Sequence, residues 1–298
     1  MNSERGARVN LPIWFLWLQG KDEMPEVVKL CYESWGFHNA GHDLIFLDKS
    51  NLYEYVQLDD SILGNKNLTV QALSDVIRIN LLDQNGGVWV DATCYCHRPL
   101  QSWLEEVMPE GFFAFDRPTP DRMIASWFLA SKLGNELVRQ YAESVNRYWL
   151  EHSNLQSEFI LRNESGSVRA KFFQDPNTQK ALSNDPQLWF HKAFVNVLRV
   201  YPYFYFHYFF ERNYARLDSF REIWDSTPRV SADDPHELQY FGLDKPATAE
   251  IDQIIRAPKT PVSKLTHKFD LSACLSDSVI RRLQANHLEL LSGNLVNN

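Results

Sequence analysis

Short apolar runs and amphipathic stretches alternate along the first part of the chain. Residues 13–18 and 44–47 are wholly apolar, which is typical of strands that are buried on both faces of a sheet. After the first run, Pro25 opens a segment whose apolar positions recur with a 3.6-residue period, which predicts a helix, and a shorter helix is expected over 48–56. This order of strand, helix, strand and helix is typical of a Rossmann-like nucleotide-binding half.

The next stretch joins a predicted helix to a predicted strand. Apolar positions over 73–82 are spaced for a buried helix, which we expect to end at Asn85 and Gly86. The apolar run 88–90 consists of strand-forming residues and ends on Asp91. Because α/β proteins commonly bind ligands at the carboxyl end of such a strand, Asp91 is predicted to bind a ligand.

Two charged residues lie on the helix that precedes this strand. Asp75 and Arg78 are three positions apart, so they share a face and can pair. One interpretation is an ion pair on a solvated edge of the helix. The other is that both side chains reach the same cleft as Asp91, one strand further along.

The remaining elements are strands over 111–115 and 126–130 and helices over 135–152 and 276–291. Residues 153–185 are polar and mixed, and they predict no element. Residues 186–224 are rich in aromatic side chains, which indicates either a helical subdomain packed on the sheet or an acceptor groove, because aromatic faces stack on sugar rings. His207 lies in this zone and is interpreted as a core residue.

Composition narrows the class of protein. A chain of 298 residues that is 44% hydrophobic suits one large α/β domain or a domain with a helical extension. Its formal net charge of −8 argues against a nucleic-acid partner. Residues 1–10 are polar and are not followed by an apolar segment of signal-peptide type, and no apolar run is long enough to span a membrane. We therefore expect a cytoplasmic protein whose four cysteines are free, buried thiols.

The nucleotide-binding half contains no glycine-rich phosphate loop, which argues against a dinucleotide-dependent dehydrogenase and a P-loop nucleotidase. Instead, the segment SDVIRINLLDQNGGVWVDAT resembles the core motif of glycosyltransferase family 32, and more closely its capsular polysaccharide synthesis branch. The segments IWFLWLQG, SWFLAS, YFYFHYFF and KLTHK are similar to other parts of that family. The resemblance therefore covers most of residues 11–268.

The resemblance implies an α/β fold of the GT-A type, a Rossmann-like nucleotide-sugar-binding fold with a mixed, mainly parallel sheet and an added helical, aromatic-rich region. The expected regions are a flexible N-terminus over 1–10, a nucleotide-sugar-binding core over 11–134, a helical acceptor-side region over 135–257, and a C-terminal loop and closing helix over 258–298.

The resemblance also implies a donor site. Asp75 and Arg78 are expected to contact the sugar hydroxyls and the phosphate of the donor, with Asp91 as the third catalytic residue, and Ser126 to line the cleft. Either Trp14 or Trp17 is expected to stack on the base, since period-two alternation turns them to opposite faces.

The tail carries three basic residues close together in a proline-rich segment, Lys264, His267 and Lys268. They indicate either a solvated loop or, as the resemblance implies, a loop that closes over the donor diphosphate.

The expected cofactor is Mn²⁺ or Mg²⁺ on Asp91, because these hard cations prefer oxygen ligands. In the wider family a second acid follows two positions later, where this chain has Thr93. Three alternatives follow: a weakly bound metal, a metal held by Asp91 and His267, or a diphosphate stabilised by Lys264 and Lys268.

The predicted function is transfer of a hexosyl group, with retention of configuration, from a UDP-linked nucleotide-sugar to a glycan in capsular or surface polysaccharide synthesis. A lipid-linked acceptor would bring the protein into peripheral contact with the inner face of the membrane. The alternatives are a toxin-like protein glycosyltransferase and a non-catalytic nucleotide-sugar-binding protein.

Overall fold

The structure is a computed structural model that describes residues 11–293, so the expectation for residues 1–10 lies outside the described residues. The strands are β1 (Ile13–Leu16), β2 (Leu44–Leu47), β3 (Gly87–Val90), β4 (Cys94–Cys96), β5 (Phe112–Thr119), β6 (Arg122–Ser131), β7 (Gln156–Ser157), β8 (Val200–Tyr201) and β9 (Val262–Lys264). The helices are α1 (Glu26–His38), α2 (Leu52–Tyr55), α3 (Asp60–Leu63), α4 (Val70–Asn85), α5 (Leu104–Val107), α6 (Glu136–Glu151), α7 (Glu158–Arg162), α8 (Val168–Gln174), α9 (Pro176–Asn184), α10 (Tyr205–Arg216), α11 (Asp218–Ser226), α12 (Asp233–Phe241), α13 (Ala249–Arg256) and α14 (Val279–Leu291).

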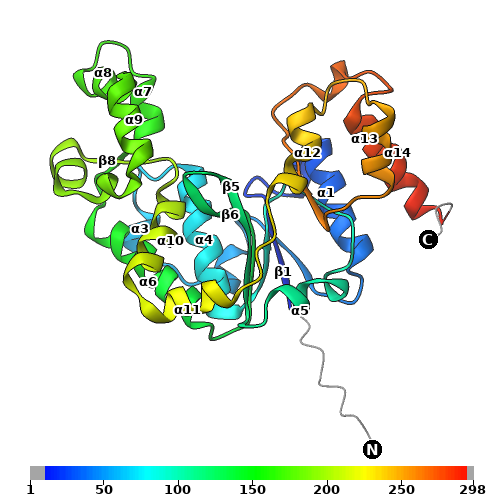
Figure 1. The fold of residues 1–298 in the computed structure, drawn as a ribbon, viewed down its shortest axis with the longest axis horizontal. Coiled ribbons are helices and arrows are strands. Elements are labelled where there is room, and N and C mark those ends of the chain that lie inside the picture. The colour runs from blue at the N-terminus through cyan, green and yellow to red at the C-terminus, as the bar shows by residue number, and fades with distance from the viewer. Residues whose placement is uncertain (1–10, 294–298) are drawn as a thin grey trace, which may run out of the picture.

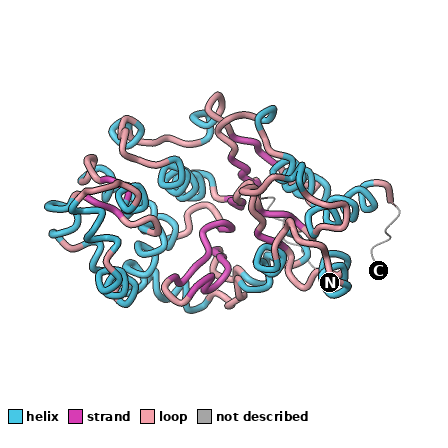
Figure 2. The backbone as a smooth tube through the Cα atoms, turned by 90° about the horizontal axis from the view of Figure 1, so that it is seen from above, coloured by secondary structure: helices cyan, strands magenta, loops and turns pink. Residues whose placement is uncertain are grey.

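A five-stranded sheet in the order β2-β1-β3-β6-β5 lies between two layers of helices (Figure 1). Strand β1 pairs in parallel with β2 and β3, whereas β6 is antiparallel to both of its neighbours. Four of the five strands therefore run in one direction, which confirms the mixed, mainly parallel sheet. Figure 2 shows helices on both sides of these strands.

Alternate residues of β1 enter two different hydrophobic cores, because successive side chains of a strand point to opposite faces. Ile13 and Phe15 pack in the core that includes α1, α13 and α14, and Trp14 and Leu16 in the core that includes α4, α6 and α10. The strand ends at Leu16, two residues earlier than its apolar run predicts, so Trp17 leaves the sheet.

The helical regions are divided by the sheet. Helices α6, α10 and α11 cover one face, whereas α12 and α13 lie with α14 and α1 on the other (Figure 1). Residues 153–185, for which the sequence predicts no element, form α7, α8 and α9 of a projecting lobe with a small core of its own. The aromatic residues of α10 pack against α6 and the sheet, as in a helical subdomain.

The C-terminal segment pairs with the end of the central motif. Strand β9 is antiparallel to β4, with Lys264 opposite Cys94 and Ser263 opposite Tyr95. The amide of Leu265 also donates to the carbonyl oxygen of Thr93 at 2.8 Å. This small sheet fixes the tail beside the residues that follow β3.

All four cysteines are free, as expected. Cys31, Cys94 and Cys96 are buried, whereas Cys274 is only partly buried.

The glycine pair at the junction of α4 and β3, Gly86 and Gly87, generates a prediction about stability. Gly87 has a φ of 105°, and a Cβ added there would lie 2.5 Å from Nε1 of Trp14 and 2.6 Å from the carbonyl oxygen of Pro12. Because strain and collision add, we expect Gly87→Ala to lower the free energy of unfolding by more than about 1 kcal/mol in urea titrations. Gly41→Ala is the control, since its Cβ would meet nothing within 4 Å. Equal effects of the two substitutions would contradict this account.

Candidate functional site

A cavity of about 700 Å³ opens beyond the carboxyl ends of β1 and β3, where α/β sheets commonly bind ligands. Nine of the ten residues predicted for the site line it: Trp17, Asp75, Arg78, Asp91, Thr93, Ser126, Lys264, His267 and Lys268. Trp14 does not, because it lies in the core, 2% exposed, with its Nε1 donating to the carbonyl oxygen of Gly86 at 2.8 Å. Of the two candidate tryptophans, only Trp17 faces the cavity.

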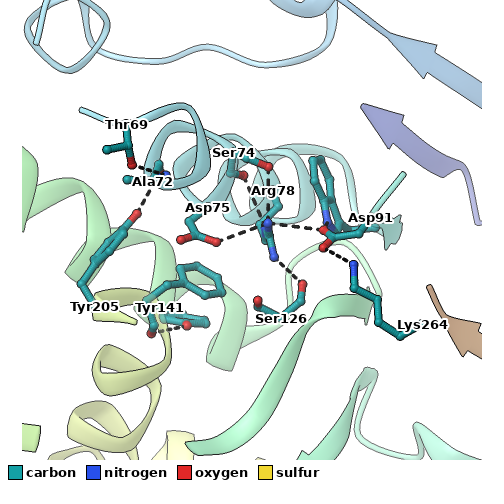
Figure 3. Close-up of polar contacts among 12 residues, drawn as sticks. Thr69, Ala72, Ser74, Asp75, Arg78, Asp91, Ser126, Tyr141, Tyr205 and Lys264 are labelled. Carbon is teal, nitrogen blue, oxygen red and sulfur yellow. Dashed lines mark hydrogen bonds and ion pairs between the residues drawn. The ribbon is translucent and has the colours of Figure 1, made fainter. Parts of the chain in front are cut away.

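Asp91 follows directly on β3 and is joined to Arg78 and Lys264 in the polar network in Figure 3. Its backbone amide donates to the carbonyl oxygen of Trp127 at 2.8 Å, which fixes the turn out of the strand. Its Oδ1 accepts from Nε1 of Trp89 at 3.0 Å, and its Oδ2 from Nζ of Lys264 at 2.9 Å. Both carboxylate oxygens are therefore held in place.

Arg78 connects the helix α4 to two strands. Its Nη2 lies 3.3 Å from Oδ1 of Asp75 and 3.4 Å from Oδ1 of Asp91, and its Nη1 donates to the carbonyl oxygen of Ser126 at 2.6 Å (Figure 3). The side chains of Asp75 and Arg78 are only 12% and 7% exposed. The pair therefore lies in the cleft rather than on a solvated edge of the helix.

Lys264 reaches the same network from the opposite end of the chain. Its Nζ donates to Oδ2 of Asp91 and, at 2.8 Å, to Oγ1 of Thr93, and its side chain is 16% exposed. For Lys264, the solvated-loop interpretation is therefore wrong. Lys268 is exposed at the rim of the cavity, and the ring of His267 meets Trp17 edge-on at 5.5 Å.

Burial and the neighbouring charges shift the acids in opposite directions. Burial would raise the pKa of the Asp91 carboxyl, but Lys264 and Arg78 lower it to about 2. Burial raises the pKa of Asp75 to about 7. The nearby positive charge of Arg78 lowers this pKa, and the negative charge of Asp91 raises it further. Although burial lowers the pKa of Lys264, Asp91 more than compensates and raises it, so the ammonium stays charged.

The cavity is positively charged in an acidic protein. The cations that line it are Arg78, Arg122, Lys264 and Lys268, and the carboxylates are Asp75 and Asp91, a formal excess of two positive charges. Burial lowers the pKa of all three lining histidines, His207, His236 and His267, so none adds a charge at pH 7. The chain as a whole carries −8. Such a cavity suits a ligand with about two negative charges.

The cavity is also lined by Arg122, which the sequence did not identify, and by residues of the aromatic zone. The guanidinium of Arg122 lies 4.0 Å from the ring centre of Phe204, next to Tyr203. His207 is 8% exposed, and its Nδ1 has no hydrogen-bond partner within the described part of the chain. It is buried, as expected for a core residue, yet it lines the cavity. No local pattern distinguishes its sequence neighbourhood from an aromatic core.

The side chains in this arrangement do not fit a resident divalent ion. Within residues 11–293, no group of three or more histidine, cysteine or acidic side chains could hold a metal. The carboxylate of Asp91 is already paired with two cations, and Thr93 accepts a hydrogen bond from one of them. The expected Mn²⁺ or Mg²⁺, and the role of His267 as a ligand, stay predictions.

Comparison with known proteins gives three findings. Residues 1–163 match the sequence model of the family described as capsular polysaccharide synthesis protein. The chain is 27% identical over 165 residues to O-glycosyltransferase braB of Annulohypoxylon truncatum. The aligned region covers 48% of this chain and 39% of that protein. Among solved structures, PaToxG Glycosyltransferase matches with a TM-score of 0.36 and 15% identity, over 75% of this chain and 82% of that chain. The chain thus spans about two fifths of the curated relative, and the structural likeness is too distant to define the fold.

The network around Arg78 generates a prediction about stability. Arg78→Ala removes the cation that pairs with the buried Asp75 and one of the two cations that pair with the partly buried Asp91, so we expect the free energy of unfolding to fall by about 3–5 kcal/mol. Arg139→Ala is the control, because Arg139 makes exposed ion pairs with Glu136 and Glu143, and solvent screens such surface pairs. Urea unfolding of both variants measures the difference. Similar losses would show that the Arg78 pairs contribute no more than surface pairs.

The raised pKa of Asp75 generates a prediction about pH. The folded protein binds a proton on Asp75 up to about pH 7, whereas the unfolded chain releases it near pH 3.9. The contribution of Asp75 to the free energy of unfolding should therefore fall as the pH rises from about 4 to 7, by up to about 1.4 kcal/mol for each unit of the shift. The buried histidines, whose pKa burial lowers, impose the opposite slope on wild type and variants alike, so the quantity to measure is the difference between wild type and variant. Asp75→Asn cannot ionise, so this difference should change between about pH 4 and 7, whereas for the exposed Asp225→Asn it should stay constant. Parallel pH profiles for Asp75→Asn and wild type would contradict the raised pKa.

Proposed function

The chain belongs to the capsular polysaccharide synthesis protein family, and on this premise we propose that it is a glycosyltransferase that moves a hexosyl group from a nucleotide-sugar to a glycan acceptor. We further propose that the donor is UDP-linked and that the product is part of a capsular or other surface polysaccharide.

One observation carries this proposal. The cavity at the carboxyl ends of β1 and β3 has a formal excess of two positive charges in a chain of net charge −8. A donor diphosphate carries about the complementary charge, and a chain without a glycine-rich phosphate loop needs such side-chain cations to bind it. The volume, about 700 Å³, suits a ligand of nucleotide-sugar size.

The proposed roles follow from where each side chain lies. Arg78, fixed by Asp75 and Asp91, presents its guanidinium beside the diphosphate, while Asp75 accepts a hydrogen bond from a sugar hydroxyl. Trp17 lines the cavity, and its Nε1 donates to the carbonyl oxygen of Glu23 at 3.2 Å, which orients the ring. Its proposed role is to stack on the base. An oriented ring loses little conformational freedom when a base stacks on it.

The proposed reaction is a front-face displacement with retention of configuration. The bond from the anomeric carbon to the diphosphate oxygen breaks, and its electron pair leaves with the diphosphate. The acceptor hydroxyl oxygen forms the new bond to the same carbon from the same side. Its proton passes to the departing diphosphate oxygen. The cations of the cavity stabilise the negative charge that develops on the leaving group.

The acceptor is proposed to enter along the wall formed by Tyr203, Phe204 and His207, because aromatic faces stack on sugar rings. The unpartnered Nδ1 of His207 is a hydrogen-bonding atom for an acceptor hydroxyl. Within the described residues, no helix is long and apolar enough to cross a membrane. A lipid-linked acceptor met by peripheral contact at the inner face of the membrane is part of the proposal.

The test is binding and turnover of a panel of UDP-, GDP- and dTDP-linked sugars, followed by thermal shift and by release of nucleotide. We expect one donor to raise the melting temperature and to be hydrolysed slowly, and Asp91→Asn to lower that turnover by at least about 100-fold, because Lys264 and Arg78 lose their shared anion. Asp225→Asn, an exposed carboxylate on α11, is the matched control. The anomer of the product, identified by NMR, tests retention. A donor that binds without turnover would favour the non-catalytic binding protein. If no donor shifts the melting temperature or releases nucleotide, the proposed site is refuted.

A further inference from the structure

The cation beside Asp91 belongs to the chain itself. Pairing of β9 with β4 places Lys264 opposite Cys94, and this register brings its ammonium between Oδ2 of Asp91 and Oγ1 of Thr93, at 2.9 and 2.8 Å. Asp91 and Thr93 are the first and third positions of the triplet after β3, from which a second acid is missing. The neutral Thr93 accepts a hydrogen bond from the ammonium, whereas two acids would suit a divalent ion.

A divalent ion and this ammonium cannot share the carboxylate. Mg²⁺ requires oxygen ligands at about 2.0–2.1 Å in near-octahedral geometry. Oδ1 of Asp91 is held by Trp89 and Arg78, so only Oδ2 is left for a metal, and Lys264 already lies 2.9 Å from it. An ion bound there would face two cations in a cleft of low exposure, where like charges repel strongly.

The ammonium also has a free donor. A lysine ammonium makes up to three hydrogen bonds, and Lys264 uses two of them within residues 11–293, on Asp91 and Thr93. Because Lys264 lines the cavity, the third N–H is available to an oxygen of a bound anion. Asp91 and Thr93 thus orient a positive charge toward the space where the diphosphate is proposed to bind.

We propose that Lys264 takes the place of a divalent cation, so that its ammonium binds the nucleoside diphosphate of the donor and the transfer proceeds without metal. This inference rests on the proposed function and specifies the cation of that same site. The bonds that form and break are those of the front-face displacement. Lys264 keeps its proton throughout and stabilises the charge on the departing diphosphate.

The first experiment needs no variant. Metal-stripped wild-type protein is assayed for donor turnover in EDTA, in Mg²⁺ and in Mn²⁺, and binding of Mn²⁺ alone is followed by electron paramagnetic resonance. We expect turnover in the three conditions to agree within about twofold, and free Mn²⁺ to keep its unbound spectrum. Turnover that is lost in EDTA and restored by Mn²⁺ would overturn the inference while leaving the proposed function intact. Absence of binding and turnover under all three conditions would instead overturn the proposed function.

The second experiment exchanges one cation for the other. Lys264→Ala should lower turnover in EDTA by about 10²–10³-fold, since a charged donor to the leaving group is lost. Because the substitution vacates Oδ2 of Asp91, Mn²⁺ should now bind and restore part of the activity. The double variant Lys264→Ala with Thr93→Asp supplies the second acid and should bind Mn²⁺ more tightly.

Lys259→Ala is the matched control, because Lys259 is exposed, lies five positions earlier in the same segment and does not line the cavity. Its donor turnover should equal that of wild type and should be the same in EDTA, in Mg²⁺ and in Mn²⁺. If Lys264→Ala folds, as judged by thermal unfolding, and keeps wild-type turnover in EDTA, the inference is overturned. If it does not fold, the EDTA and Mn²⁺ measurements on wild type still decide the question.

Discussion

The carboxylate of Asp91 is the point on which this structure depends. It holds three side chains that come from the strand before it, from α4 and from the C-terminal strand β9. Buried ion pairs are stable only when each charge is compensated, because removal from water costs more than a single contact returns. The network therefore constrains α4, β3 and β9 to meet at one place, and that place is the floor of the cavity.

The same network buries Asp75 and makes its ionised form less favourable. Asp75 pairs with Arg78, but its burial raises its pKa to about 7, whereas the same arginine helps to lower the pKa of Asp91 to about 2. The two carboxyl groups contact the same guanidinium, yet their different surroundings give them different pKa values. Titratable pairs whose surroundings separate their pKa values are common at functional sites.

The architecture supplies the walls around that floor. The sheet separates two cores, and each contributes one side of the cavity: α4 and the start of α10 from one layer, and α12 with the segment after β9 from the other. A ligand in the cavity would therefore contact both layers as well as the strand ends. This explains why residues as distant in sequence as Trp17, Arg122 and His267 line one space.

The sequence by itself determined the local elements. Periodicity and capping residues are short-range signals, so β1 to β3, α1, α4 and α6 could be located, as could the acid at the end of β3 and the pairing of Asp75 with Arg78. Only the tertiary structure decided how the distant parts meet. Lys264 lies 173 positions from Asp91, and no local pattern specifies the β4–β9 register that joins them. Alternation showed that Trp14 and Trp17 face opposite ways, but the end of β1 at Leu16 decided which one faces the cavity. The sequence neighbours of His207 would be the same whether its ring were enclosed in a core or lined a cavity. The packing of the layers, which sequence spacing does not encode, places the ring at the cavity.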